Sequence, residues 1–214
     1  MSLTQPAVIE EILRRSPVLP VVTIADATTA PDVARALVRG GIRTIEVTLR
    51  TPAGLPALQA IAREVPEIAL GAGTVLSAAD LRAAADAGAS FAVSPGSTPA
   101  LLEAAAAGPL AYLPAIATAS ELMLGLTAGY HCFKLFPAAA VGGTALLRGF
   151  AGPFPQARFC PTGGISQENL RSYLDLPNVL CVGGSWLAPP ALIASRDWDR
   201  LEALAAHAAR SRPP

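Results

Sequence analysis

The sequence predicts an α/β fold, a (β/α)₈ barrel preceded by an N-terminal helix, with residues 1–214 forming one domain. Eight short β-rich runs start about 20 to 27 residues apart, which is the length of one strand, one helix and two loops. Polar residues also follow many different runs, as expected for a barrel whose site is built from several strand ends. A doubly wound open sheet, which concentrates its site at one crevice, is the alternative.

The eight expected strands share a high content of β-branched and aromatic residues. They cover residues 18–24, 44–50, 69–75, 91–96, 111–117, 131–137, 158–165 and 179–186. Helix start signals lie between them, as first-turn prolines and as pairs with capping-box spacing: Pro31, Ser77 with Asp80, Pro99 after Thr98, and Thr118 with Glu121. Glycines stand where four of these helices should end: Gly40, Gly88, Gly108 and Gly129.

Charge and hydropathy exclude several classes of partner. Sixteen basic and sixteen acidic side chains balance, so no basic field attracts nucleic acid or an anionic membrane. The opening MSLTQPAVIEEILRRS lacks the apolar core of a signal peptide, and no run approaches the roughly 18 apolar residues of a membrane span. We therefore expect a cytoplasmic protein. Cys132, Cys160 and Cys181 lie in apolar runs without metal-site spacing, which predicts buried, reduced thiols.

Lysine occurs once, as Lys134 in the apolar run HCFKLFP, although the chain has fifteen arginines. On a solvated surface either cation serves, so a surface lysine spared by chance is one reading. Arginine stays charged at any working pH, whereas a desolvated lysine can lose its proton and act as a nucleophile. The position of Lys134 therefore indicates chemistry.

Strand alternation predicts which side chains meet Lys134. In TIEVTLR, Glu46 and Arg50 share the polar face, which should point into the barrel, and in HCFKLFP the inward face carries Cys132, Lys134 and Phe136. Buried charges require partners, so Glu46 and Arg50 either form an ion pair that closes the barrel or belong to a site with Lys134. A second cation favours loss of the lysine's proton and attracts an anionic substrate.

Glycine pairs end the last two strands, in PTGGIS and VGGSW. Many barrels bind phosphate at this place, because backbone N–H groups approach the oxygens where no Cβ interferes. The side chain of Ser185 and the helix start near Ser166 are candidate additional donors. A glycine pair alone commonly marks only a turn, but two pairs in these positions predict an anion site.

Six motifs together resemble those of the 2-keto-3-deoxy-6-phosphogluconate (KDPG) aldolase family, which also acts on 4-hydroxy-2-oxoglutarate. They are EVTLR at Glu46–Arg50, GAGT at Gly71–Thr74, SPG at Ser94–Gly96, FKLFPA at Phe133–Ala138, PTGGI at Pro161–Ile165 and VGGSW at Val182–Trp186. The resemblance implies a class I, metal-independent aldolase of the Entner–Doudoroff pathway. It implies no cofactor, and a homotrimer as the assembled form.

The same resemblance implies individual roles. Lys134 would form the Schiff base, and Glu46 would be the general acid/base that works through a bound water. The substrate-binding residues would be Arg50 and Thr74 on the pyruvate carboxylate, Pro95 and Phe136 around that pocket, Thr162 beside the substrate chain, and Gly163, Gly164, Gly184 and Ser185 on the phosphate.

Other functions stay open at this point. An epimerase, an isomerase or a metal-dependent aldolase would need metal ligands or an acid/base pair, but the two histidines, His131 and His207, fall away from the expected site. A phosphate-binding barrel without chemistry would leave the inward lysine unexplained. Within the aldolases, the galactonate-derived epimer and 4-hydroxy-2-oxoglutarate compete with KDPG as the preferred substrate.

Overall fold

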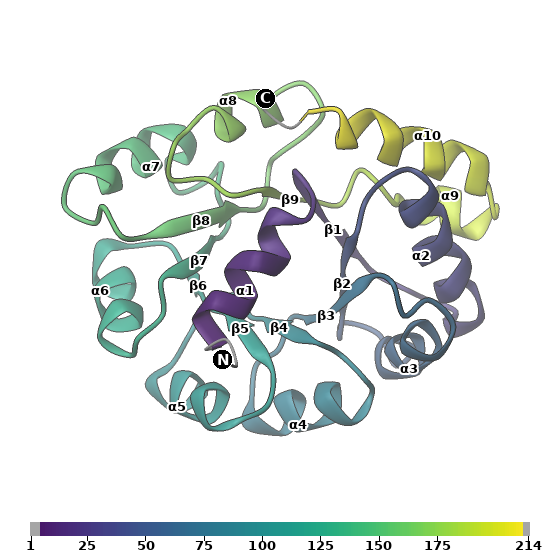
Figure 1. Ribbon diagram of the computed structural model, residues 1–214, viewed down its shortest axis with the longest axis horizontal. Coiled ribbons are helices and arrows are strands. Elements are labelled where there is room, and N and C mark those ends of the chain that lie inside the picture. The colour runs from purple at the N-terminus through teal and green to yellow at the C-terminus, as the bar shows by residue number, and fades with distance from the viewer. Residues whose placement is uncertain (1–4, 212–214) are drawn as a thin grey trace.

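The structure, a computed structural model, describes residues 5–211. Parallel strands lie around a common centre with helices outside them, and one further helix crosses the strands (Figure 1). Six strands form one sheet in the order β5-β4-β3-β2-β1-β9, and three form a second in the order β6-β7-β8. Their bounds are β1 Val18–Val22, β2 Thr44–Thr48, β3 Ala69–Gly73, β4 Phe91–Val93, β5 Ala111–Leu113, β6 Ala115–Ile116, β7 Cys132–Leu135, β8 Arg158–Pro161 and β9 Val182–Gly184.

Pro114 divides the strand expected over 111–117 into β5 and β6. Proline has no N–H to donate to a ladder, so β5 pairs with β4 while β6 pairs with β7. The chain thereby passes from the six-stranded sheet into the three-stranded one. The expectation of a single strand here is wrong, although the two short strands still follow each other around the curled sheet.

Two isolated bridges, Phe159 with Val179 and Thr162 with Gly183, join the other edge of the three-stranded sheet to the segment around β9. The structure thus shows a curled parallel sheet in two hydrogen-bonded parts, instead of one continuous eight-stranded ladder. The strand expected over 179–186 is correspondingly short, because regular pairing is confined to Val182–Gly184.

Several helix signals are confirmed. Thr118 and Glu121 form a reciprocal capping box on α6, and Thr98 caps α5 with Pro99 in its first turn. Helices follow most strands, and a one-turn 3-10 helix, η1, precedes α2. Their bounds are α1 Gln5–Arg14, η1 Ala27–Thr29, α2 Ala30–Arg39, α3 Gly54–Glu64, α4 Ala78–Asp86, α5 Pro99–Ala107, α6 Ala119–Thr127, α7 Gly143–Ala151, α8 Leu170–Leu174, α9 Pro190–Ala194 and α10 Trp198–Ala209.

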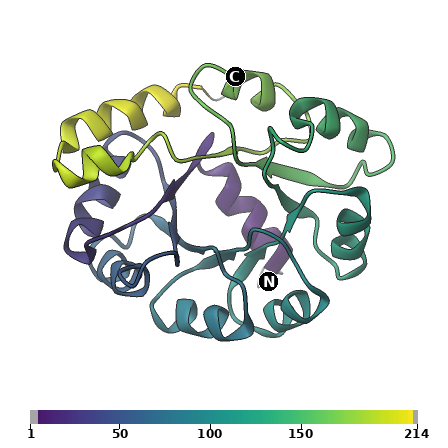
Figure 2. The same cartoon turned by 180° about the vertical axis from the view of Figure 1, so that it is seen from behind.

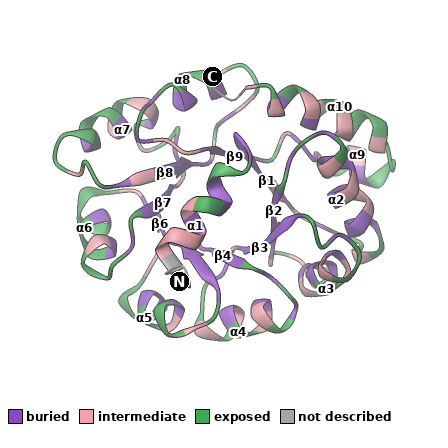
Figure 3. Ribbon diagram, viewed as in Figure 1, coloured by how far each residue is buried: buried purple, intermediate pink, exposed green. Residues whose placement is uncertain are grey.

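Two hydrophobic layers hold the fold. The larger lies between the sheet and the outer helices, whose outward faces are exposed (Figure 3). The smaller lies inside the curl, where Ile9, Ile12 and Leu13 of α1 pack on side chains from the strands. Because α1 contacts early strand residues such as Ala69 and Cys132, it covers the amino ends of the strands and leaves the carboxyl ends open.

All three cysteines belong to this inner layer and are free and buried, as predicted. Burial raises the pKa of Cys132 to about 12, and a hydrogen bond with Cys160 together with burial raises the pKa of Cys181 well above its ordinary value. Within residues 5–211, no helix is long and apolar enough to span a membrane.

The cysteines should therefore resist thiol reagents in the native protein. All three thiols are buried, the thiolate is the reactive form, and a pKa near 12 leaves Cys132 with almost none of it at pH 8. A colorimetric thiol titration at pH 8 should detect three thiols in guanidinium chloride and almost none before unfolding. Ser195→Cys, at an exposed position of the helical surface, serves as the positive control. Immediate reaction of the native cysteines would contradict their burial in the inner hydrophobic layer.

Candidate active site

Lys134 and Glu46 meet inside the curl of the sheet. Lys134 Nζ donates to Glu46 Oε1 at 3.2 Å and to Oε2 at 3.3 Å, and the exposed fractions of the two residues are 4% and 1%. They come from β7 and β2, two strands that do not pair with each other, so the contact spans the interior. Phe133 and Leu135 pack in the outer layer instead, which confirms the predicted alternation along the lysine strand.

Gly73 on β3 makes room for the carboxylate. A Cβ built on Gly73 would lie 2.2 Å from Glu46 Oε1, a distance at which the side chain must move. Gly73 pairs with Thr48 of β2 and therefore lies directly beside the glutamate's strand. The GAGT motif contains Gly73, but spacing alone does not show which side chain occupies the space above a glycine.

Arg50 lies at the opening of the site instead of inside it. It follows the end of β2, its side chain is exposed, and its Nε donates to Thr74 Oγ1 at 3.0 Å. Thr74 has a φ of +60°, an uncommon backbone region for a β-branched residue and a local strain. Alternation continues past β2, since Leu49 packs on the outer layer and Arg50 lines the same cavity as Lys134, but the alternative of a Glu46–Arg50 ion pair is wrong. The ion pair of Glu46 forms with Lys134, and Arg50 pairs with no carboxylate among the described residues.

A cavity of about 120 Å³ opens above the lysine at the carboxyl ends of the strands, on the side that Figure 2 shows. It is lined by Val21, Arg50, Lys134, Phe136, Thr162, Gly163, Gly164, Ile165, Gly183 and Ser185. The structure thus brings seven of the eleven predicted site residues to one cavity. The ring of Phe136 lies 5.4 Å from Lys134 Nζ, a cation–π distance that also shields the amine from water.

Two further predicted residues do not line the cavity but hydrogen-bond to residues that do. Glu46 accepts from Lys134, and Thr74 accepts from Arg50. Gly183 lines the cavity, and its neighbour Gly184 lies against the ring of Trp186. The backbone role expected of Gly184 stays a prediction.

Pro95 does not line this cavity. It follows β4 in a segment held by hydroxyl groups, where Tyr112 donates to Ser94 at 2.6 Å and Ser97 lies 3.3 Å from each of them. No signal in the sequence predicts that Tyr112 donates a hydrogen bond to Ser94. The contact becomes visible only when β5 is paired with β4 in the structure.

Ser166 is not available as an additional anion donor. Its N–H donates to Asn169 Oδ1 at 2.9 Å, and its hydroxyl donates to Glu168. The sequence placed Ser166 near a helix start, but α8 begins only at Leu170. The helix start expected near Ser166 therefore lies four residues further along the chain, and the side chain of Asn169, which carries no signal in the sequence, contacts this loop.

The histidines lie where the sequence placed them, away from the site. His131 and His207 are both exposed. Residues 5–211 hold no group of three or more histidine, cysteine, aspartate or glutamate side chains placed to bind a metal ion.

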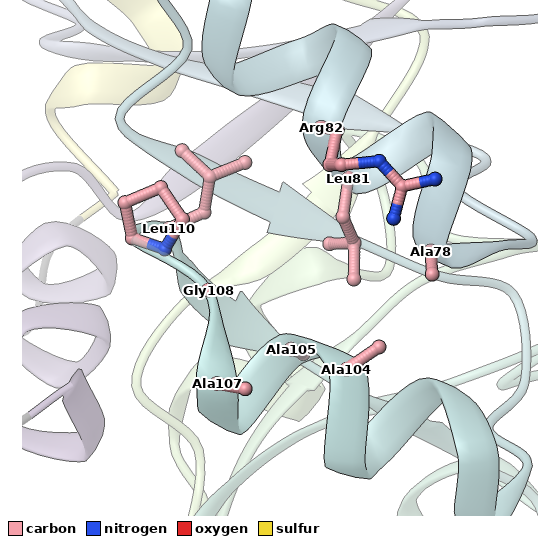
Figure 4. Close-up of a pocket in the computed structure, with 9 residues that line it drawn as sticks. Ala78, Leu81, Arg82, Ala104, Ala105, Ala107, Gly108 and Leu110 are labelled. Carbon is pink, nitrogen blue, oxygen red and sulfur yellow. The ribbon is translucent and has the colours of Figure 1, made fainter.

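A larger hollow of about 410 Å³ lies on the outer surface between α4 and α5 (Figure 4). Small and apolar side chains line it, and Arg82 is its one charged residue: Ala78, Leu81, Arg82, Ala104, Ala105, Ala107, Gly108, Pro109 and Leu110. It offers no nucleophile and no acid/base pair. Despite its size, this hollow is not a candidate active site. The residues that can carry out chemistry lie at the smaller cavity beside Lys134.

A curled parallel sheet with a buried lysine and carboxylate, below a cavity lined by Arg50, hydroxyl groups and glycines, defines a protein class, the α/β enzymes that use a lysine amine on carbonyl substrates. Comparison with known proteins narrows the class. The sequence profile of the family described as "KDPG and KHG aldolase" matches residues 9–204, and the chain belongs to this family.

Individual relatives agree with that membership. The KHG/KDPG aldolase of Escherichia coli (strain K12) is 52% identical over 199 residues, which covers 93% of each chain. The KDPG aldolase of Legionella pneumophila, whose crystal structure captures pyruvate at low pH as a covalent carbinolamine intermediate, is 44% identical with a TM-score of 0.92, covering 94% of this chain and 97% of that one. The Zymomonas mobilis ZM4 enzyme with 3-phosphoglycerate is 46% identical with a TM-score of 0.91, covering 95% and 96%.

Gly73→Ala should remove most activity without unfolding the protein. The new methyl group displaces the Glu46 carboxylate from Lys134, so the loss should be about 10²-fold or more, as for a misplaced general acid/base. Cleavage of KDPG, measured as pyruvate release, gives the result. Gly149→Ala is the matched control, since a Cβ there meets open space. Wild-type turnover in Gly73→Ala would contradict the placement of Glu46.

Proposed function

We propose that the protein is a class I aldolase that cleaves KDPG to pyruvate and glyceraldehyde 3-phosphate, and 4-hydroxy-2-oxoglutarate to pyruvate and glyoxylate. The observation that carries the proposal is the buried contact of 3.2 Å between the only lysine of the chain and Glu46, directly below a cavity lined by Arg50, hydroxyl groups and glycines. Family membership supports both substrates. Relatives named for the gluconate-derived compound argue against the galactonate-derived epimer.

The first half of the reaction uses the lysine amine. Glu46 accepts a proton from the Lys134 ammonium, and the neutral amine adds to the C2 carbonyl carbon of the substrate. The resulting carbinolamine loses water and becomes a protonated imine. Arg50 holds the substrate carboxylate at the opening, where its planar guanidinium binds both oxygens and Thr74 fixes its orientation.

The second half breaks the bond between C3 and C4. Glu46, directly or through a water, takes the proton of the C4 hydroxyl, the electron pair of the C3–C4 bond moves toward the imine, and the aldehyde leaves. The enamine that remains is protonated at C3 and hydrolysed to pyruvate and free Lys134. Thr162 lies beside the substrate chain, while Gly163, Gly164 and Ser185 receive the distal phosphate.

We extend the proposal to the architecture. Residues 1–214 form one domain, and the two isolated bridges and the passage at Pro114 close the strands into a (β/α)₈ barrel. The family profile, which runs from residue 9 to residue 204 without interruption, supports one domain. The three free cysteines fit a reducing, cytoplasmic location.

The assembled form is a homotrimer in this proposal. Three large apolar side chains of the described residues are exposed: Leu76 just before α4, and Met123 and Leu124 on α6, where Leu124 lines a surface hollow against α5. A second copy of the chain would cover this surface. The mass of the protein in solution tests the assembly.

Reduction of the Schiff base tests the function. Pyruvate and sodium borohydride should give a stable adduct that peptide mass mapping places on Lys134, because the chain has no other lysine. Lys134→Arg should form no adduct and show no turnover, since arginine does not lose its proton. Excess EDTA should leave wild-type activity unchanged. A folded wild-type protein without an adduct would refute the aldolase proposal.

Ser185→Ala tests where the phosphate binds. Loss of one hydroxyl donor to a charged group should raise the KM for KDPG about 5- to 50-fold, in line with the usual strength of such hydrogen bonds. The KM for 4-hydroxy-2-oxoglutarate should change much less. An equal rise for both substrates would place the phosphate elsewhere.

A further inference from the structure

The loop after β8 presents unpaired backbone donors to the cavity. Gly163 and Gly164 have φ values of +98° and +75°, two consecutive left-handed residues that turn the chain sharply. Among the described residues, no hydrogen bond engages the N–H groups of Gly164 and Ile165, and both residues line the cavity. Successive free N–H groups in such a turn form a concave site for an anion.

One side of the loop rests against the segment that follows the lysine strand. Ala138 donates to the Thr162 carbonyl at 2.8 Å, and Ala139 donates to the Gly163 carbonyl at 3.0 Å. A Cβ on Gly164 would lie 2.4 Å from the Ala139 Cβ, so the two segments are in close contact. These bonds fix the loop as far as Gly163 but leave the next peptide unit unheld on this side.

Asn169 holds that next peptide unit from the other side. Its Nδ2 donates to the Gly164 carbonyl at 3.0 Å, and its Oδ1 accepts the Ser166 N–H at 2.9 Å. The two partners fix the amide orientation, because a flipped Asn169 would place donor against donor and acceptor against acceptor. One side chain thus ties the backbone on both sides of Ile165.

The bond to Gly164 has a geometric consequence for Ile165. The Gly164 carbonyl and the Ile165 N–H belong to the same planar trans peptide and point in opposite directions. Because Asn169 holds the carbonyl on its own side, the Ile165 N–H faces away from Asn169, toward the cavity that Ile165 lines. Without this bond, the peptide unit is free to rotate its donor away from the anion.

Stabilisation of α8 does not explain the position of Asn169. The residue occupies the position before this short helix, yet its side chain makes no capping hydrogen bond to the helix. Both side-chain bonds reach back into the glycine loop.

We propose that Asn169 is a positioning residue that orients the Gly164–Ile165 peptide so that its N–H binds the distal phosphate of the substrate. The inference rests on the aldolase function proposed above and adds a residue that selects phosphorylated substrates. It acts through the backbone and does not touch the reacting carbons.

The test compares two measurements on Asn169→Ala. The KM for KDPG should rise about 5- to 20-fold, the usual effect of one or two lost hydrogen bonds to a charged group. The rate at which borohydride and pyruvate modify Lys134 should stay within about twofold of wild type, because pyruvate carries no distal phosphate. Gln167→Ala, an exposed neighbour in the same turn, is the matched control and should change neither value.

Asn169→Ser is the second variant, for use if Asn169→Ala does not fold, and should show the same split. An unchanged KM for KDPG, or an equal loss in cleavage and in pyruvate trapping, would overturn the positioning role. Failure of the aldolase function itself is distinguishable, since wild-type protein would then give no pyruvate adduct at all. If Ser185→Ala raises the KM for KDPG and neither Asn169 variant does, the phosphate binds at the proposed place but Asn169 has no part in orienting the loop.

Discussion

The ion pair between Lys134 and Glu46 is the constraint on which the rest of the structure depends. Both charges are almost fully removed from water, and each would be left uncompensated without the other, at a cost of about 3 to 5 kcal/mol. Several features serve this pair. Gly73 leaves space for the carboxylate, Phe136 covers the amine, and α1 closes the amino ends of the strands with an apolar layer. Water and substrate therefore reach the lysine only from the carboxyl ends.

In the proposed function, the cavity at those ends combines two kinds of anion recognition. Arg50 would supply a charged side chain that Thr74 holds at the opening, whereas the turns after β8 and β9 would supply backbone N–H groups and the hydroxyl of Ser185. A side chain can adjust to its ligand, but a peptide N–H points only where the backbone is held. This difference explains why the glycine loop is braced on both sides, by Ala138 and Ala139 and by Asn169.

Periodicity predicted the parts of the site that lie within strands. Alternation along β2 and β7 turned Glu46 and Lys134 inward, and helix capping at Thr98 and Thr118 followed from local chemistry. The predictions failed where regular structure ends. The helix expected near Ser166 begins only at Leu170, the strand expected over 111–117 is divided at Pro114, and the side chain of Asn169 contacts the glycine loop without any signal in the sequence. Outside a strand, no repeating rule relates sequence position to side-chain direction.

The sequence by itself determined the alternation of strands and helices, the inward lysine and glutamate, the buried cysteines and the family to which six spaced motifs point. These features depend on local periodicity and on residue type. Only the tertiary structure decided that Glu46 pairs with Lys134 and not with Arg50, that the space above Gly73 is filled by a carboxylate from the next strand, and that Asn169 holds the Gly164 carbonyl. Each of these joins atoms across a strand boundary or a turn, and their distances follow from how the sheet curls, which no single segment encodes.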